Sequence, residues 1–126
     1  MRDDGARDAG FTPLTVATSA PDHKPYYPGA HELHMRWIGD RDSGRLLGCQ
    51  IAGHRDGQVA KRIDIPAAAI FAGLAIDQIG DLDLSYTPPF GMPWDALQLA
   101  AQAWTAELEP KRAPTVVASH HEHPQR

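Results

Sequence analysis

The stretch HELHMRWIGDRDSGRLLGCQIA, residues 31–52, decides the fold. Apolar and polar residues alternate on both sides of a short polar turn at residues 40–44, which is typical of two antiparallel strands joined as a hairpin. Gly44, near the end of this turn, suits the backbone that tight turns require. The first strand places Leu33, Met35 and Trp37 on one face and polar side chains on the other. The stretch therefore predicts an antiparallel hairpin with one buried face.

The segments around the hairpin show the same alternation or a helical period. Residues 11–20 and 81–86 alternate as strands do, whereas 58–74 and 93–108 carry apolar residues at helical spacings of three and four. The expected helical stripes are Val59, Ile63, Pro66, Ile70 and Leu74 in the first helix, and Trp94, Leu97, Ala101, Trp104 and Leu108 in the second. Pro66 should kink or break the first helix, because it lacks an N–H donor.

Short helical turns are also expected at residues 2–9 and 77–79. The order of the elements mixes strands with helices, and the strands are expected to pair antiparallel. The fold class predicted from this order is α+β, a small antiparallel sheet with helices packed on one face.

Composition excludes several classes of protein. The chain has 126 residues and a net charge of −4 without a basic run, which argues against binding to nucleic acid. One cysteine allows neither an intrachain disulfide nor a thiolate zinc cluster. No apolar run approaches the ~18 residues of a membrane span, and no secretory signal is visible, so we expect a cytoplasmic protein. The length leaves no room for a dinucleotide-binding domain beside this fold.

Few residues offer chemistry by themselves. Cys49 lies on an apolar strand face and is expected to be a packing residue. His31 and His34 should face opposite sides of their strand, and His54 should lie in a surface turn. The pair Lys61-Arg62 is expected to be a solvated helix face. The sequence also lacks the glycine-rich motifs that cradle phosphates.

Three tyrosines stand out because each lies beside proline-rich backbone. Tyr26 and Tyr27 lie in KPYYPG, and Tyr86 lies in SYTPPF. Proline restricts the backbone and so holds an aromatic hydroxyl in place. Such tyrosines are typical of interface anchors, although simple core aromatics remain the alternative.

Four segments in order resemble one known family. They are PDHKPYYPG (residues 21–29), GRLLGCQ (44–50), KRID (61–64) and LSYTPPF (84–90). Together they resemble the C-terminal dimerisation domain of FAD-dependent pyridine nucleotide-disulfide oxidoreductases, with the branch of CoA-disulfide reductases and NADH oxidases as the nearest. The resemblance predicts this domain over residues 10–110, after a short N-terminal segment at 1–9. Residues 111–126 are expected to be a disordered, histidine-containing tail.

The resemblance implies a partner and a place for the tyrosines. The domain should form a homodimer or pair with a flavoprotein subunit, and FAD and NAD(P)H should be bound elsewhere than in this chain. Tyr86 matches the Tyr-x-Pro-Pro tyrosine and Tyr26 or Tyr27 the Tyr-Tyr-Pro-Gly tyrosine, and these should reach toward the partner's redox cysteine. We therefore expect a detached dimerisation domain without redox turnover alone. One alternative is a subunit that completes the active site of a separate flavoprotein. A more remote alternative is a metal-binding protein that uses His120, His121 and His123.

Overall fold

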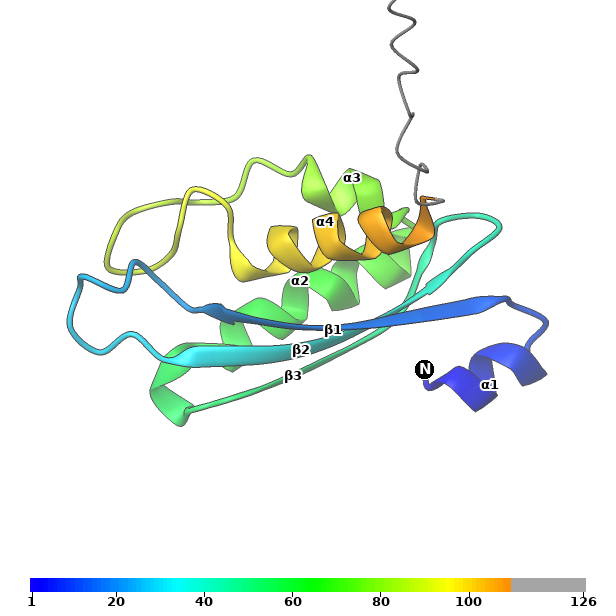
Figure 1. Ribbon diagram of the computed structural model, residues 1–126, viewed down its shortest axis with the longest axis horizontal. Helices are drawn as coiled ribbons and strands as arrows, with labels where there is room; N and C mark the ends of the chain where they lie inside the picture. Colours follow the sequence, from blue (N-terminus) through cyan, green and yellow to red (C-terminus); the bar gives the residue numbers. More distant parts are fainter. Residues whose placement is uncertain (110–126) are drawn as a thin grey trace, which may run out of the picture.

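A computed structural model describes residues 1–109 of the chain. The strands form one three-stranded sheet. Figure 1 shows the longer C-terminal helices on one side of this sheet and a short N-terminal helix on the other. The elements in chain order are α1 (Asp3–Asp8), β1 (Pro13–Pro21), β2 (Glu32–Asp40), β3 (Leu46–Gly53), the 3-10 helix η1 (Arg55–Gly57), α2 (Val59–Ala72), α3 (Ile76–Gly80) and α4 (Ala96–Leu108). The predicted α+β class, with a small antiparallel sheet and helices on one face, is confirmed.

The sheet has the order β1-β2-β3, and both pairs of strands are antiparallel. The predicted hairpin forms between β2 and β3, with Leu33 opposite Gly53 and Trp37 opposite Cys49. The register shifts by one residue between Ile38 and Gly39, which is a bulge at the turn end of the hairpin. The predicted strand at residues 11–20 is β1, displaced by one or two residues.

The main core lies between the sheet and helices α2, α3 and α4. Leu33, Met35 and Trp37 point into it, as predicted. Trp104 of α4 is 2% exposed, and its indole N–H donates to the Leu14 carbonyl oxygen over 2.8 Å. Glycine is required on β2 at residue 39, because a Cβ there would lie 2.5 Å from the Trp104 ring. The hairpin and α4 therefore fix each other's position.

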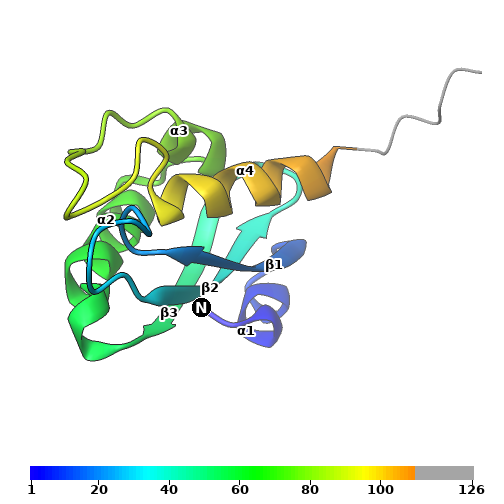
Figure 2. The same cartoon turned by 60° about the vertical axis from the view of Figure 1, so that its left-hand side comes forward.

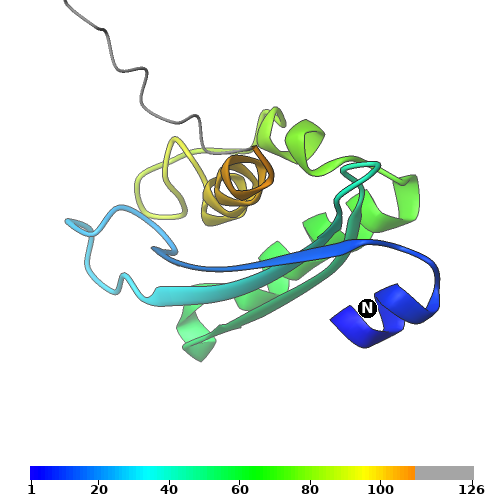
Figure 3. The ribbon, with the colours of Figure 1, turned by 45° about the vertical axis from the view of Figure 1, so that its right-hand side comes forward.

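Helix α1 covers part of the opposite face of the sheet (Figure 3). Ala6 is fully buried there in a small second cluster with Ile38 and Leu47. Asp3 accepts hydrogen bonds from the Thr15 hydroxyl and the Arg36 guanidinium. The predicted helical turn at residues 2–9 is thus formed, and it adds a layer that the predicted arrangement of helices on one face did not include.

Three predictions about the secondary structure are wrong. Residues 81–86 form no strand, because this segment pairs with no neighbour within residues 1–109. Helix α4 begins at Ala96 rather than at residue 93, and Trp94, placed in its buried stripe, is 56% exposed. Helix α2 runs through Pro66 without a break. Pro66 is buried in it, whereas Ile70 of the expected stripe is exposed.

The described part of the chain has no helix that is both long and apolar enough to cross a membrane. The domain boundaries at residues 10 and 110 stay predictions. The predicted tail, residues 111–126, lies outside the described residues.

Candidate functional site

Two loops lie at one end of the molecule (Figures 1 and 2). They carry most of the exposed aromatic side chains of residues 1–109. The first aromatic loop, residues 22–31, holds Tyr26 and Tyr27, and the second, residues 81–95, holds Tyr86 and Phe90. Tyr26 is 70% exposed, Phe90 66% and Tyr86 42%. The rings of Tyr26 and Tyr27 lie 5.4 Å apart and are tilted by 49°. The exposure excludes the reading of these tyrosines as core aromatics.

The first aromatic loop begins at Asp22 and ends at His31, and we call this pair of residues its neck. Two hydrogen bonds between Asp22 and His31 close the neck. The backbone N–H of Asp22 donates to the His31 carbonyl over 2.9 Å, and the Asp22 carboxylate accepts from the His31 N–H over 2.8 Å. Asp22 is only 3% exposed, so these bonds are shielded from water. The loop therefore leaves the sheet as a closed unit, with both tyrosines at its exposed part.

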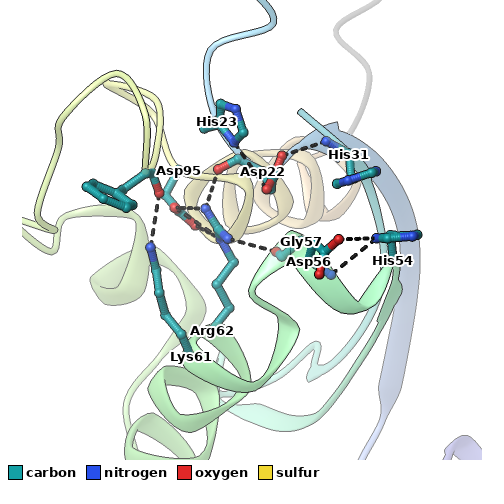
Figure 4. A network of polar contacts seen from close by, with 10 residues as sticks. Asp22, His23, His31, His54, Asp56, Gly57, Lys61, Arg62 and Asp95 are labelled. Carbon is teal, nitrogen blue, oxygen red and sulfur yellow. Dashed lines mark hydrogen bonds and ion pairs between the residues drawn. The ribbon is translucent and has the colours of Figure 1, made fainter. Parts of the chain in front are cut away.

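Arg62 of α2 connects the two aromatic loops from inside the protein (Figure 4). Its guanidinium donates to the Asp22 carbonyl at the start of the first loop, and it lies 3.1 Å from an Asp95 carboxylate oxygen at the end of the second. A third bond of 3.4 Å reaches the Gly57 carbonyl. Arg62 is 1% exposed. The planar guanidinium spreads five donors over three nitrogen atoms and so reaches all three acceptors, whereas the three donors of a lysine lie on a single atom.

The second aromatic loop is anchored through Asp95 and Gln98. Asp95 caps α4, because its carboxylate accepts from the Leu97 N–H over 3.0 Å, while the Gln98 side chain accepts from the Asp95 N–H. The Gln98 amide donates back to the Leu82 carbonyl over 2.7 Å. Lys61 adds a bond of 3.0 Å to the Phe90 carbonyl. The backbone that carries Tyr86 is therefore held at both ends without belonging to a strand.

The electrostatics of the neck favour an ionised Asp22. Burial by itself would raise the pKa of this carboxyl group. The His31 N–H, the contact with His23 and the charge of Arg62 act in the opposite direction and hold the pKa below its ordinary value. His23 Nδ1 lies 3.2 Å from the carboxylate, and its Nε2 is buried and makes no hydrogen bond within residues 1–109.

Cys49 lies apart from the aromatic loops, on β3, and packs against the main core as predicted. Burial raises the pKa of its thiol to about 12, so the thiolate is absent at neutral pH. Cys49 is therefore a packing residue.

The sequence prediction missed Arg62. The pair Lys61-Arg62 was expected to be solvated, which holds for Lys61 and is wrong for Arg62. The reason is that the acceptors of Arg62 lie 40 and 33 residues away, on two loops whose positions depend on the finished fold. One local signal was present: Asp95 followed three residues later by Gln98 is the pattern of a capping box.

Comparisons of the sequence and of the fold with known proteins point to one family. No protein-family model matches the chain. The NAD(P)H coenzyme A polysulfide/persulfide reductase of Pyrococcus horikoshii is 34% identical over 93 residues, which cover 74% of this chain and 20% of that protein. The NADH oxidase of Methanocaldococcus jannaschii is 36% identical over 86 residues, covering 68% of this chain and 18% of that protein. The solved NAD-dependent persulfide reductase from A. fulgidus matches with a TM-score of 0.79 and 36% identity, covering 85% of this chain and 20% of that one.

The chain matches the C-terminal region of pyridine nucleotide-disulfide oxidoreductases. The resemblance seen in the four sequence segments is thereby confirmed. The chain spans about a fifth of the length of the curated relatives that it matches. Residues 1–109 contain an antiparallel sheet and no parallel βαβ unit with a glycine-rich turn, so they do not fit a flavin or nicotinamide dinucleotide. The roles of Tyr26, Tyr27 and Tyr86 stay predictions.

Proposed function

We propose that this domain is the dimerisation module of a flavin- and NAD(P)H-dependent disulfide or persulfide reductase, and that it presents tyrosines to the redox centre of a partner subunit. The observation that carries the proposal is the pair of exposed aromatic loops tied together from within by buried Arg62. Exposed aromatic side chains on a rigid support are the usual anchors of protein interfaces, because little conformational entropy is lost when they are covered.

The tyrosine hydroxyls define the chemical contribution of the domain. A phenol can donate a hydrogen bond to a thiolate or to the sulfur of a substrate, and it can accept one in return. Tyr86 and one of Tyr26 and Tyr27 would act in this way on a cysteine that the partner subunit supplies. Cys49 cannot take that part, since its thiol is half-buried and stays protonated.

The redox cofactors belong to other domains in this proposal. FAD and NAD(P)H would be bound outside this domain, which alone would carry out no redox turnover. The residues of this domain would bind the partner subunit, orient the tyrosine hydroxyls and shield the redox centre of the partner. The partner is a second copy of the domain in a homodimer, or a flavoprotein subunit whose active site the domain completes.

Sedimentation of the purified full chain at micromolar concentration tests the pairing. We expect a dimer that is weakened at least tenfold by Tyr26→Asp or Phe90→Asp, because each substitution places a charge among the aromatic side chains that pairing would cover. Arg41→Gln is the matched control, since it changes the net charge by the same amount in the turn at the other end of the sheet (Figure 1). A chain that stays monomeric at this concentration contradicts the homodimer.

The proposed role of the tyrosines has to be tested in a complex with the flavoprotein partner. Tyr86→Phe removes only a hydroxyl group at an exposed site, so the domain should fold and bind as before. In a complex with the flavin-bearing subunit, we expect a lower turnover rate with binding unchanged. Unchanged turnover for Tyr86→Phe, and also for Tyr26→Phe and Tyr27→Phe, would leave the domain with a purely structural role.

A further inference from the structure

Two histidines and an aspartate meet beside the neck of the first aromatic loop (Figure 4). The imidazole rings of His31 and His54 are stacked, with their centroids 4.1 Å apart and their planes 14° from parallel. Asp56 joins them, so that one nitrogen or oxygen atom from each of the three residues lies within 4.8 Å of the others. The hairpin register brings them together, because Leu33 faces Gly53 and the residues just outside this pair are therefore neighbours.

The spacing between His54 and Asp56 is that of two ligands of one ion. Nδ1 of His54 accepts a hydrogen bond from the Asp56 N–H over 3.2 Å, so it presents a lone pair. The same nitrogen lies 3.5 Å from a carboxylate oxygen of Asp56. A lone pair and a carboxylate oxygen repel each other at this distance unless a proton or a metal ion lies between them. Two ligands about 2.05 Å from a tetrahedral zinc ion are about 3.4 Å apart, which is close to the observed spacing.

We propose that His31, His54 and Asp56 form a binding site for a divalent transition-metal ion of the zinc type. Two imidazoles and one carboxylate suit Zn²⁺, Ni²⁺ or Cu²⁺ better than Mg²⁺ or Ca²⁺, which prefer oxygen ligands. Water would complete the coordination, since His54 and Asp56 are exposed. The ion would replace the Asp56 N–H at Nδ1, and this N–H can be hydrated because the turn lies at the surface.

Binding requires small movements only. Stacked rings direct their lone pairs side by side, so His31 must tilt out of the stack for both nitrogens to reach one ion. His54 has a half-exposed side chain, which leaves room for such a rotation. Arg55 lies 3.6 Å from Asp56 and would compete with the ion for the carboxylate, but its side chain is 89% exposed and free to move away.

The position of the site links it to the two aromatic loops. The backbone of His31 closes the neck of the first loop on Asp22, while His54 caps η1, whose Gly57 carbonyl accepts a hydrogen bond from Arg62. A bound ion would therefore join the neck of the first loop to the segment that leads into α2. The site does not depend on the proposed pairing of the domain, and it uses other residues than the tail histidines.

The test is zinc binding by the full chain in which His120, His121 and His123 are all replaced by alanine. Competition with a chromophoric chelator gives the stoichiometry and the affinity. We expect one Zn²⁺ per chain, and a loss of at least tenfold in affinity for His31→Ala, for His54→Asn and for Asp56→Asn. Asparagine at position 54 keeps a side-chain acceptor for the cap of η1, so this variant should fold.

His34→Ala is the matched control. His34 is an exposed histidine of β2, three residues after His31, and its side chain bonds Ser19 of β1. Its replacement should leave the affinity for zinc unchanged. The proposal is overturned if the chain without tail histidines binds no Zn²⁺, or if His31→Ala and His54→Asn bind as tightly as His34→Ala. Sedimentation without added metal reports on the pairing separately, so a failure of one proposal is distinguishable from a failure of the other.

Discussion

Helices α2 and α4 have 14 and 13 residues and pack on the same face of the sheet, yet they bury different kinds of side chain. Helix α4 buries an apolar stripe that ends in Trp104, together with the short polar side chain of Gln98 at its start. Helix α2 buries the cation Arg62 along with Pro66 and Ala69, and leaves Phe71 95% exposed. The difference shows that α4 holds the sheet and, through Gln98, the second aromatic loop, whereas α2 holds both aromatic loops through Arg62.

The largest effect is expected from breaking the buried ion pair of α2. Arg62→Ala leaves Asp95 without its cation, and removal of one partner of a buried pair costs roughly 3–5 kcal/mol. The free energy of unfolding from urea titration should fall by this amount. Lys61→Ala, at the neighbouring but exposed position, should change it by less than about 0.5 kcal/mol.

A double variant sharpens this prediction. Arg62→Met with Asp95→Asn removes both charges and keeps a capping side chain at the start of α4. It should lose less stability than the sum of the two single variants, because neither buried charge is then left alone. Additive losses would mean that Arg62 and Asp95 do not interact in the folded domain.

The same comparison explains what the sequence could predict. The apolar stripe of α4 was correct at Leu97, Ala101 and Trp104, since these residues pack on a sheet whose alternation was itself visible. The stripe of α2 was wrong at Ile70, because the buried face of α2 is centred on a charged residue. No periodicity of apolar residues can reveal a buried arginine, whose burial depends on acceptors far away in the sequence.

Alternation along one segment was also insufficient to define a strand. The hairpin at residues 31–52 was predicted correctly because two alternating segments and a turn between them were all present. Residues 81–86 alternate as well, but with no partner strand in residues 1–109 their backbone is held by the Gln98 side chain instead. The contact of His31 with His54 follows from the register of the hairpin, which alternation along each strand does not specify by itself.

A smaller loss of stability is expected at acidic pH. Hydrogen bonds from Ser43 and Thr12 hold the pKa of Asp40 below its ordinary value of 3.8, and bonds from Thr15 and Arg36 do the same for Asp3. The pKa of Asp22 is lowered against the effect of its burial. A lowered folded-state pKa stabilises the protein above the unfolded value, and this contribution is lost as the pH falls through the folded-state value.

The midpoint of urea unfolding should therefore be constant near neutral pH and fall below about pH 4. Asp40→Asn removes one of these carboxylates and should make the decline between pH 4 and pH 2 less steep. Asp83→Asn, at an exposed position, is the control and should leave the decline unchanged. A midpoint that does not change down to pH 2 would contradict the lowered pKa values.

The smallest change in the free energy of unfolding is expected from a substitution on the outer face of α2. Phe71→Ser should change the free energy of unfolding by less than about 0.5 kcal/mol, because the ring is almost fully exposed in the folded domain and loses no packing. Ala69→Ser, two residues earlier and 3% exposed, places a hydroxyl group in the core and should cost about 1–3 kcal/mol. The helix propensities of alanine and phenylalanine differ by less than about 0.7 kcal/mol, so propensity alone accounts for only part of the expected difference. A loss above 1 kcal/mol for Phe71→Ser would mean that the ring packs in the folded chain, and the contrast between α2 and α4 would then be confined to Arg62.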